Sequence, residues 1–100
     1  MQEIRVVTSR NHPEERKYQC TWPIGTPGLT EGTKEQHLAG EGTQIAEKIL
    51  SLPSVTRVRL SSKMIWVWLD DPAKWNVIET DILQVLKESA PDREIKLEVN

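Results

Sequence analysis

The sequence predicts an α+β domain, a two-layer sandwich in which two helices cover one face of an antiparallel or mixed sheet of four to five strands. Helical periodicity occurs in residues 43–52 and 71–88, and a compact pair of strand patterns lies between them at 55–69. Two further strand patterns precede the first helix and one follows the second. We therefore expect the element order ββαββα, with a final β, in a single domain spanning residues 1–100.

The N-terminal part of the chain predicts two paired strands followed by a long loop. Residues 2–9 are rich in β-branched side chains, as strands are. Residues 16–22 alternate between polar and larger side chains, which is typical of a half-buried strand. One face of this second strand carries Tyr18, Cys20 and Trp22. All five glycines of the chain fall within residues 23–42, which indicates a long loop, and they form no phosphate-binding motif.

The middle of the chain holds the clearest helix and strand patterns. From Thr43, apolar residues recur at helical spacing until Pro53, which ends the helix. Residues 55–60 and 64–69 are rich in β-branched and aromatic side chains, and the three polar residues between them suit a hairpin loop.

A second helix and a last strand complete the predicted fold. Asp71 can accept a hydrogen bond from a free N–H group at the helix start, and Pro72, which has no N–H, suits the first position. The apolar face of this helix comprises Trp75, Ile78, Ile82, Val85 and Leu86. Charged and aliphatic side chains alternate strictly in residues 94–99, as they do in a half-buried strand. From the second strand onward the order also reads βαββαβ, the split arrangement called ferredoxin-like.

Alternation within the hairpin defines the candidate site. Successive side chains of a strand point to opposite sides, so we expect the aliphatic residues of both strands to meet the helices. The opposite face then carries Arg57, Arg59, Trp66 and Trp68, where guanidinium groups can lie over indole rings for about 0.5–2 kcal/mol. We interpret these four residues as the candidate partner-binding surface. Packing alone is the other explanation for tryptophans on a strand.

Composition and charge argue against several functional classes. The chain has 13 Lys and Arg residues and 15 Asp and Glu residues, which give a net charge of −2. A protein that binds nucleic acid through its phosphates usually carries an excess of positive charge, so nucleic acid is not the expected partner. No apolar run approaches the roughly 18–20 residues of a membrane span, and the first residues lack a secretory-signal profile. We therefore expect a cytoplasmic protein without membrane contact.

No constellation of catalytic or metal-binding residues stands out. Cys20, the only cysteine, lies within a predicted strand, which favours a buried, inert thiol over a nucleophile. His12 and His37 lie in predicted loops, and no ligand spacing joins them to the thiol as a metal site. Helix capping explains Asp70 and Asp71 better than an acid–base pair does. We expect no enzyme activity, no metal and no cofactor.

Three stretches of the chain carry patterns known from one protein family. Residues 11–18 form a turn that leads into a strand with a Lys-Tyr step, residues 45–58 a helix-to-strand junction, and residues 65–75 an apolar strand, an acidic turn and a tryptophan-initiated helix. In this order they resemble the N-terminal domain of Nfu/NifU-type iron–sulfur scaffold proteins over roughly residues 4–88. The family's first turn usually reads Asn-Pro-Asn, whereas this chain has Asn-His-Pro, and its middle loop is long.

The resemblance implies a standalone accessory domain, because the family's second domain with its Cys-x-x-Cys pair is absent here and one cysteine cannot supply the thiolates of a cluster. It implies a non-catalytic protein-interaction role in iron–sulfur cluster assembly or delivery, with a scaffold or client protein as the partner. The residues by themselves support an alternative, single-stranded nucleic-acid binding by bases stacked on Trp66 and Trp68 beside the two arginines. A small enzyme is the third and weakest alternative.

Overall fold

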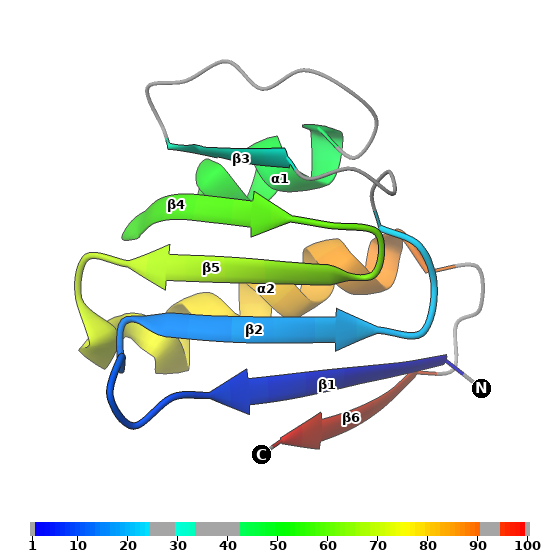
Figure 1. Cartoon of the computed structure of the whole chain (residues 1–100), viewed down its shortest axis with the longest axis horizontal. Coiled ribbons are helices and arrows are strands. Elements are labelled where there is room, and N and C mark those ends of the chain that lie inside the picture. The colour runs from blue at the N-terminus through cyan, green and yellow to red at the C-terminus, as the bar shows by residue number, and fades with distance from the viewer. Residues whose placement is uncertain (1, 25–29, 34–42, 91–94, 100) are drawn as a thin grey trace.

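The computed structural model describes residues 2–24, 30–33, 43–90 and 95–99, which form one sheet and two α-helices. The strands are β1 (Gln2–Thr8), β2 (Glu15–Cys20), β3 (Thr30–Thr33), β4 (Val55–Leu60), β5 (Met64–Leu69) and β6 (Ile95–Val99). The helical elements are α1 (Thr43–Leu50), a 3₁₀ turn η1 (Pro72–Lys74) and α2 (Trp75–Glu88). Figure 1 shows both α-helices on the same face of the sheet.

The sheet is mixed and runs in the order β3-β4-β5-β2-β1-β6. β1 and β6 are parallel, with Gln2 opposite Ile95, whereas each of the other neighbouring pairs is antiparallel. The predicted pairing of the first two strands is confirmed, since Val6 lies opposite Tyr18. The α+β class is confirmed as well.

The predicted number and order of the strands are wrong. The described residues contain six strands rather than four to five, and β3 precedes α1, so the order ββαββα does not hold. β3 lies within residues 23–42, which were predicted to be a loop because of their glycines. This short strand itself contains Gly32. Most of that predicted loop lies outside the described residues. β1 also separates β2 from β6, which a ferredoxin-like sheet would place side by side.

The start of the second helix follows the capping prediction. Asp71 Oδ1 accepts a hydrogen bond from the backbone N–H of Ala73 at 3.0 Å, and Pro72 is the first residue of η1. This 3₁₀ turn leads directly into α2, which begins at Trp75. Within the described part of the chain, no helix is long and apolar enough to cross a membrane.

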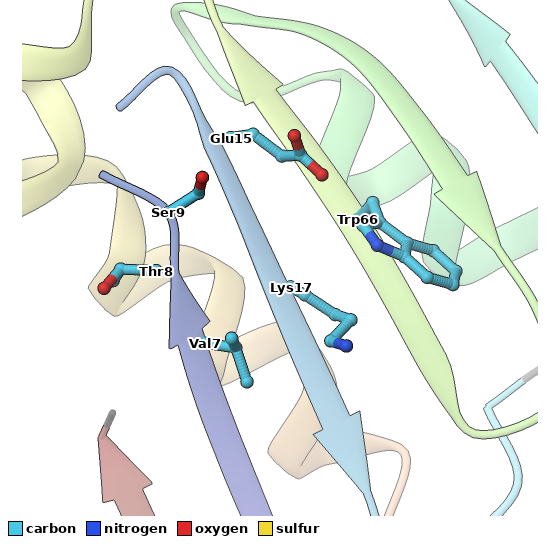
Figure 2. A pocket seen from close by; sticks show the side chains of 6 residues that line it. All are labelled: Val7, Thr8, Ser9, Glu15, Lys17 and Trp66. Atoms are coloured by element: carbon cyan, nitrogen blue, oxygen red, sulfur yellow. The ribbon is translucent and has the colours of Figure 1, made fainter. Parts of the chain in front are cut away.

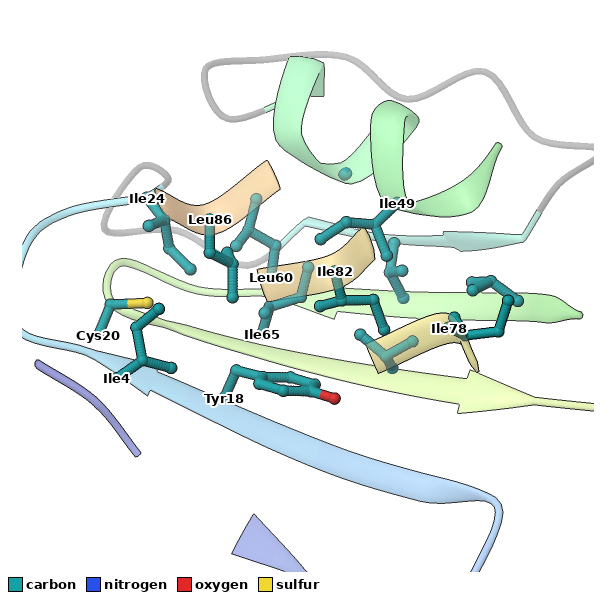
Figure 3. Packing of buried hydrophobic residues seen from close by; sticks show 14 of the residues in the cluster. Ile4, Tyr18, Cys20, Ile24, Ile49, Leu60, Ile65, Ile78, Ile82 and Leu86 are labelled. Carbon is teal, nitrogen blue, oxygen red and sulfur yellow. The ribbon is translucent and has the colours of Figure 1, made fainter. Parts of the chain in front are cut away.

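The core fills the space between the helices and the sheet face that they cover (Figure 3). The predicted inward-facing residues of the hairpin are all buried, namely Val58, Leu60, Ile65, Val67 and Leu69. From α2 the buried side chains are Trp75, Ile78, Ile82 and Leu86, while Val85 is half-buried at the margin. The aliphatic residues of the hairpin therefore face the helices, as the alternation of side chains predicts.

A partly buried polar cluster connects α2 to β2. The Tyr18 hydroxyl donates to Glu79 Oε1 at 3.0 Å, and Arg16 Nη1 lies 2.8 Å from the same oxygen. The guanidinium of Arg16 also lies 4.7 Å from the ring centre of Trp75, whose indole N–H donates to the carbonyl of Pro13 at 2.7 Å. Burial, together with the Glu79 charge, raises the pKa of Tyr18, so the phenol remains a donor at neutral pH. Each polar group of this cluster thus has a partner among the described residues.

Candidate functional site

The face of the sheet opposite the helices, termed the open face, carries the four residues of the candidate site. In the β4–β5 register, Arg57 lies opposite Trp68 and Arg59 lies opposite Trp66. The intervening Val58 and Val67 are fully buried on the helix-covered side. The structure therefore brings the four predicted residues together as two cross-strand pairs.

Each pair is a cation–π contact. Cζ of Arg57 lies 4.8 Å from the ring centre of Trp68, and Cζ of Arg59 lies 5.5 Å from that of Trp66. Both arginine side chains are 46% exposed, and both tryptophans are half-buried. Such a contact at an exposed site stabilises by about 0.5–1 kcal/mol. The rings are thereby held in one orientation and remain accessible to a partner.

Glu31, which the sequence analysis did not single out, joins the two arginines. Its carboxylate forms an ion pair with Arg57 and lies 3.9 Å from Nε of Arg59. Glu31 belongs to β3 and lies opposite Arg59 in the β3–β4 register. The only sequence signal for this strand was a pair of threonines around Glu-Gly, which is too short a pattern to predict a strand among glycines.

Two charged residues of β2 flank the tryptophans on the other side. Lys17 lies opposite Trp66, and Glu15 lies opposite Trp68. Figure 2 shows both side chains beside the Trp66 ring, at a hollow of about 130 Å³. The remaining lining residues are Val7, Thr8 and Ser9. Within the described residues, neither the Lys17 ammonium nor the Glu15 carboxylate takes part in an ion pair or side-chain hydrogen bond.

The four tryptophans fall into two classes. Trp22 and Trp75 are at most 3% exposed, and their indole N–H groups donate to protein acceptors at 3.1 and 2.7 Å. Trp66 and Trp68 lie on the open face, where no acceptor among the described residues takes their indole N–H groups. A buried donor needs a protein partner, whereas a donor on an accessible face can be met by water or by a bound molecule.

Cys20 lies on the helix-covered side of the sheet, among the core residues (Figure 3). It is 6% exposed, and burial raises the pKa of its thiol to about 12. The thiol therefore stays protonated at neutral pH and does not supply the thiolate that nucleophilic attack or metal binding requires. The predicted buried thiol is confirmed.

The histidines and carboxylates are not gathered into a site in the described part of the chain. His12 is exposed, with Nδ1 at 3.5 Å from Glu14 Oε1, and His37 lies outside the described residues. Among the described side chains, no group of three or more His, Cys, Asp or Glu residues is placed to hold a metal ion.

Comparison with known proteins yields one structural match. No protein-family model matches the chain, and no curated protein matches it. The chain is similar to the crystal structure of protein SAV1430 from Staphylococcus aureus, with a TM-score of 0.63 and 17% sequence identity, over 84% of this chain and 98% of that one. At this identity the similarity shows the fold alone, because one fold hosts many functions.

Proposed function

We propose that the chain is a non-catalytic protein-binding domain that binds its partner through the open face of the sheet. The observation that carries the proposal is the partial exposure of Trp66 and Trp68 and the lack of an acceptor for their indole N–H groups. Both rings are half-buried, oriented by Arg57 and Arg59, and left with indole N–H groups that no described residue accepts. Tryptophan and arginine are the residues that most often dominate the binding energy of protein interfaces.

The charges of the open face favour a protein over nucleic acid. The cations around the two tryptophans are Arg57, Arg59 and Lys17, and the anions are Glu15 and Glu31. A groove that follows a phosphate backbone is lined by cations, whereas this surface carries both signs. The guanidinium groups also lie over the rings on which bases would stack. A mixed surface of this kind suits a protein partner with complementary charges.

The family resemblance extends the proposal to iron–sulfur cluster assembly or delivery. In this role the chain contributes a docking surface, and its partner, a scaffold or a client protein, contributes the cysteine ligands. The buried, protonated thiol of Cys20 fits this division, because it is not available as a ligand on the surface.

The test is a double substitution, Trp66→Ser with Trp68→Ser, compared with Val77→Ser. Val77 is 66% exposed on α2, on the helix layer, so its substitution removes an exposed apolar side chain away from the open face. Tagged parent and variants are used to capture proteins from source-cell lysate, and each captured protein is then purified and its affinity measured directly. We expect the parent and Val77→Ser to bind one partner equally and the double variant to lose it.

Two results would overturn the proposed function. One is a double variant that retains the parent's affinity for its partner. The other is quenching of tryptophan fluorescence by a single-stranded oligonucleotide at low salt, reversed by added salt and abolished in the double variant, because this would assign the open face to nucleic acid.

A further inference from the structure

A row of side chains across four strands places Trp66 between two cations. Glu31 lies opposite Arg59, Arg59 opposite Trp66, and Trp66 opposite Lys17, in the β3–β4, β4–β5 and β5–β2 registers respectively. Neighbouring strands are about 4.8 Å apart, so these side chains stand next to one another on the open face. The ring of Trp66 is the centre of this row.

The two cations of the row are incompletely neutralised. Arg59 approaches Glu31 only through Nε at 3.9 Å, since the closer ion pair of that carboxylate is with Arg57. A guanidinium has five N–H donors, so most of those on Arg59 remain unused by this contact. Lys17 has no ion pair among the described residues, and the indole N–H of Trp66 has no described acceptor. Two cations thus flank the ring of Trp66, which adds its own N–H donor, and an oxyanion could accept hydrogen bonds from all three groups.

The neighbouring row of side chains, which contains Trp68, has a different arrangement of charges. Trp68 lies between Arg57, which is paired with Glu31, and the carboxylate of Glu15. A ligand carboxylate beside Trp68 would lie directly opposite Glu15, whereas in the row of Trp66 it would meet a cation on each side, although Glu15 also lines the hollow beside that ring. A charged segment that lies across the open face is therefore expected to bind in one orientation, with its acidic end beside Trp66 rather than beside Trp68.

The hollow beside Trp66 adds a second subsite, part of whose wall is apolar. Its volume is about 130 Å³, and Val7 and the Trp66 ring supply apolar wall (Figure 2). A cavity of about 150 Å³ is large enough for benzene, so an aliphatic side chain such as valine fits a hollow of this size. A ligand that fills both subsites carries a carboxylate and an aliphatic group a few ångströms apart, as neighbouring residues of a polypeptide do.

We propose that the partner presents an acidic segment whose carboxylate binds against Trp66, between Arg59 and Lys17, with an adjacent aliphatic side chain in the hollow. This proposal rests on the proposed function and makes Lys17 a specificity-determining residue. It follows that the two charged residues of β2 act in opposite directions. Lys17 strengthens the binding of an acidic segment, and Glu15 weakens it.

The experiment follows the four tryptophan indole N–H signals of the ¹⁵N-labelled full chain by NMR, each assigned by a Trp→Phe variant. The probes are the end-capped pentapeptides Ser-Glu-Val-Glu-Ser, Ser-Gln-Val-Gln-Ser and Ser-Lys-Val-Lys-Ser. We expect the acidic peptide to shift the signal of Trp66 most and to leave those of the buried Trp22 and Trp75 in place. Lys17→Gln should weaken this binding by about two- to fivefold, Lys17→Arg should restore it, and Glu15→Gln should strengthen it.

Each alternative result overturns the inference. No shift of Trp66, equal shifts with the acidic and the amide peptides, or equal affinity in parent and Lys17→Gln would exclude a carboxylate site. A tighter interaction with oligodeoxythymidylate than with the acidic peptide would assign the cations to phosphate instead.

Failure of this inference can be distinguished from failure of the proposed function. If the tryptophan double variant loses the captured partner while Lys17→Gln binds that partner as the parent does, the protein-binding function stands and the acidic segment is wrong. If the double variant also binds as the parent does, the open face is not the binding surface at all.

Discussion

The two sides of β5 differ in how deeply their side chains are buried and in whether their polar groups have partners. Toward the helices, Ile65, Val67 and Leu69 are at most 3% exposed and are packed in the core. Toward the open face, Trp66 and Trp68 are half-buried beside cations, with indole donors that no described residue accepts. One strand thus buries one set of residues in the core and presents the alternate set on the open face, because its side chains alternate.

The four tryptophans differ in the same way as the two sides of β5. The buried ones, Trp22 and Trp75, have their polar atoms paired, since an unpaired donor in the core costs about 1–3 kcal/mol. Those of the open face are held by contacts worth less than that. An accessible aromatic side chain with unused donors is therefore a better indicator of a binding surface than the presence of tryptophan as such.

The largest effect is expected from the helix-covered side. Ile82→Ala should lower the free energy of unfolding by about 2–5 kcal/mol, because the side chain is fully buried and its loss leaves a cavity. Chemical denaturation measures the change, with Val77→Ala at an exposed position of the same helix as the control. Equal midpoints for Ile82→Ala and the parent would contradict the assignment of the core.

A pH titration of stability probes Cys20 on the same side. Its pKa is raised from 9.0 to about 12, so below pH 9 both the folded and the unfolded thiol are protonated and the stability is intact. Above pH 9 only the unfolded state loses the proton, so the stability falls by about 1.4 kcal/mol per pH unit up to about pH 12. Between pH 8 and 10 the parent should therefore lose about 1–2 kcal/mol more than Cys20→Ala. Equal losses would show that the thiol is accessible.

A smaller effect on stability is expected from the open face. The double substitution of Trp66 and Trp68 by serine removes two cation–π contacts of about 0.5–1 kcal/mol each, and it should cost no more than about 2 kcal/mol. Thermal unfolding of the preparation used for binding gives the value. A loss of about 3–5 kcal/mol is the cost of truncating a buried aromatic side chain. Such a loss would mean that the open face is covered and that both sides of the sheet are buried.

The smallest effect is expected for Glu31→Gln. The substitution removes an ion pair between partly exposed groups, which is worth about 0–1 kcal/mol, and the difference from the parent should shrink further in high salt. Denaturation at low and high ionic strength measures both quantities. A loss above about 2 kcal/mol that is independent of salt would show that Glu31 contributes to packing rather than to charge pairing.

Local patterns predicted the elements whose pattern is strong. The strands at Val55–Leu60 and Met64–Leu69 have the predicted bounds, and the capping role of Asp71 was evident from the following proline. β3 was missed because its residues Thr-Glu-Gly-Thr lie among glycines and acquire strand structure by pairing with β4. The place of β1 between β2 and β6 was missed because a parallel pairing leaves no trace in local periodicity.

The candidate site was predictable in part for the same reason. Alternation alone places Arg57, Arg59, Trp66 and Trp68 on one face, and it also separates Lys17 from Tyr18. It does not say which residues of different strands stand opposite one another. The registers that bring Lys17 and Glu31 to the same row come from long-range pairing, so neither residue could be assigned to the site from the sequence.

The parallel pairing of β1 with β6 has a consequence for the order of folding. The hairpin of β4 and β5 closes over a few residues, whereas Gln2 and Ile95 come from opposite ends of the sequence and pay the loop-closure entropy of nearly the whole chain. We therefore expect the hairpin that carries the two exposed tryptophans to form before β6 is added. Substitutions that weaken β6 should accordingly speed unfolding and leave the rate of folding nearly unchanged.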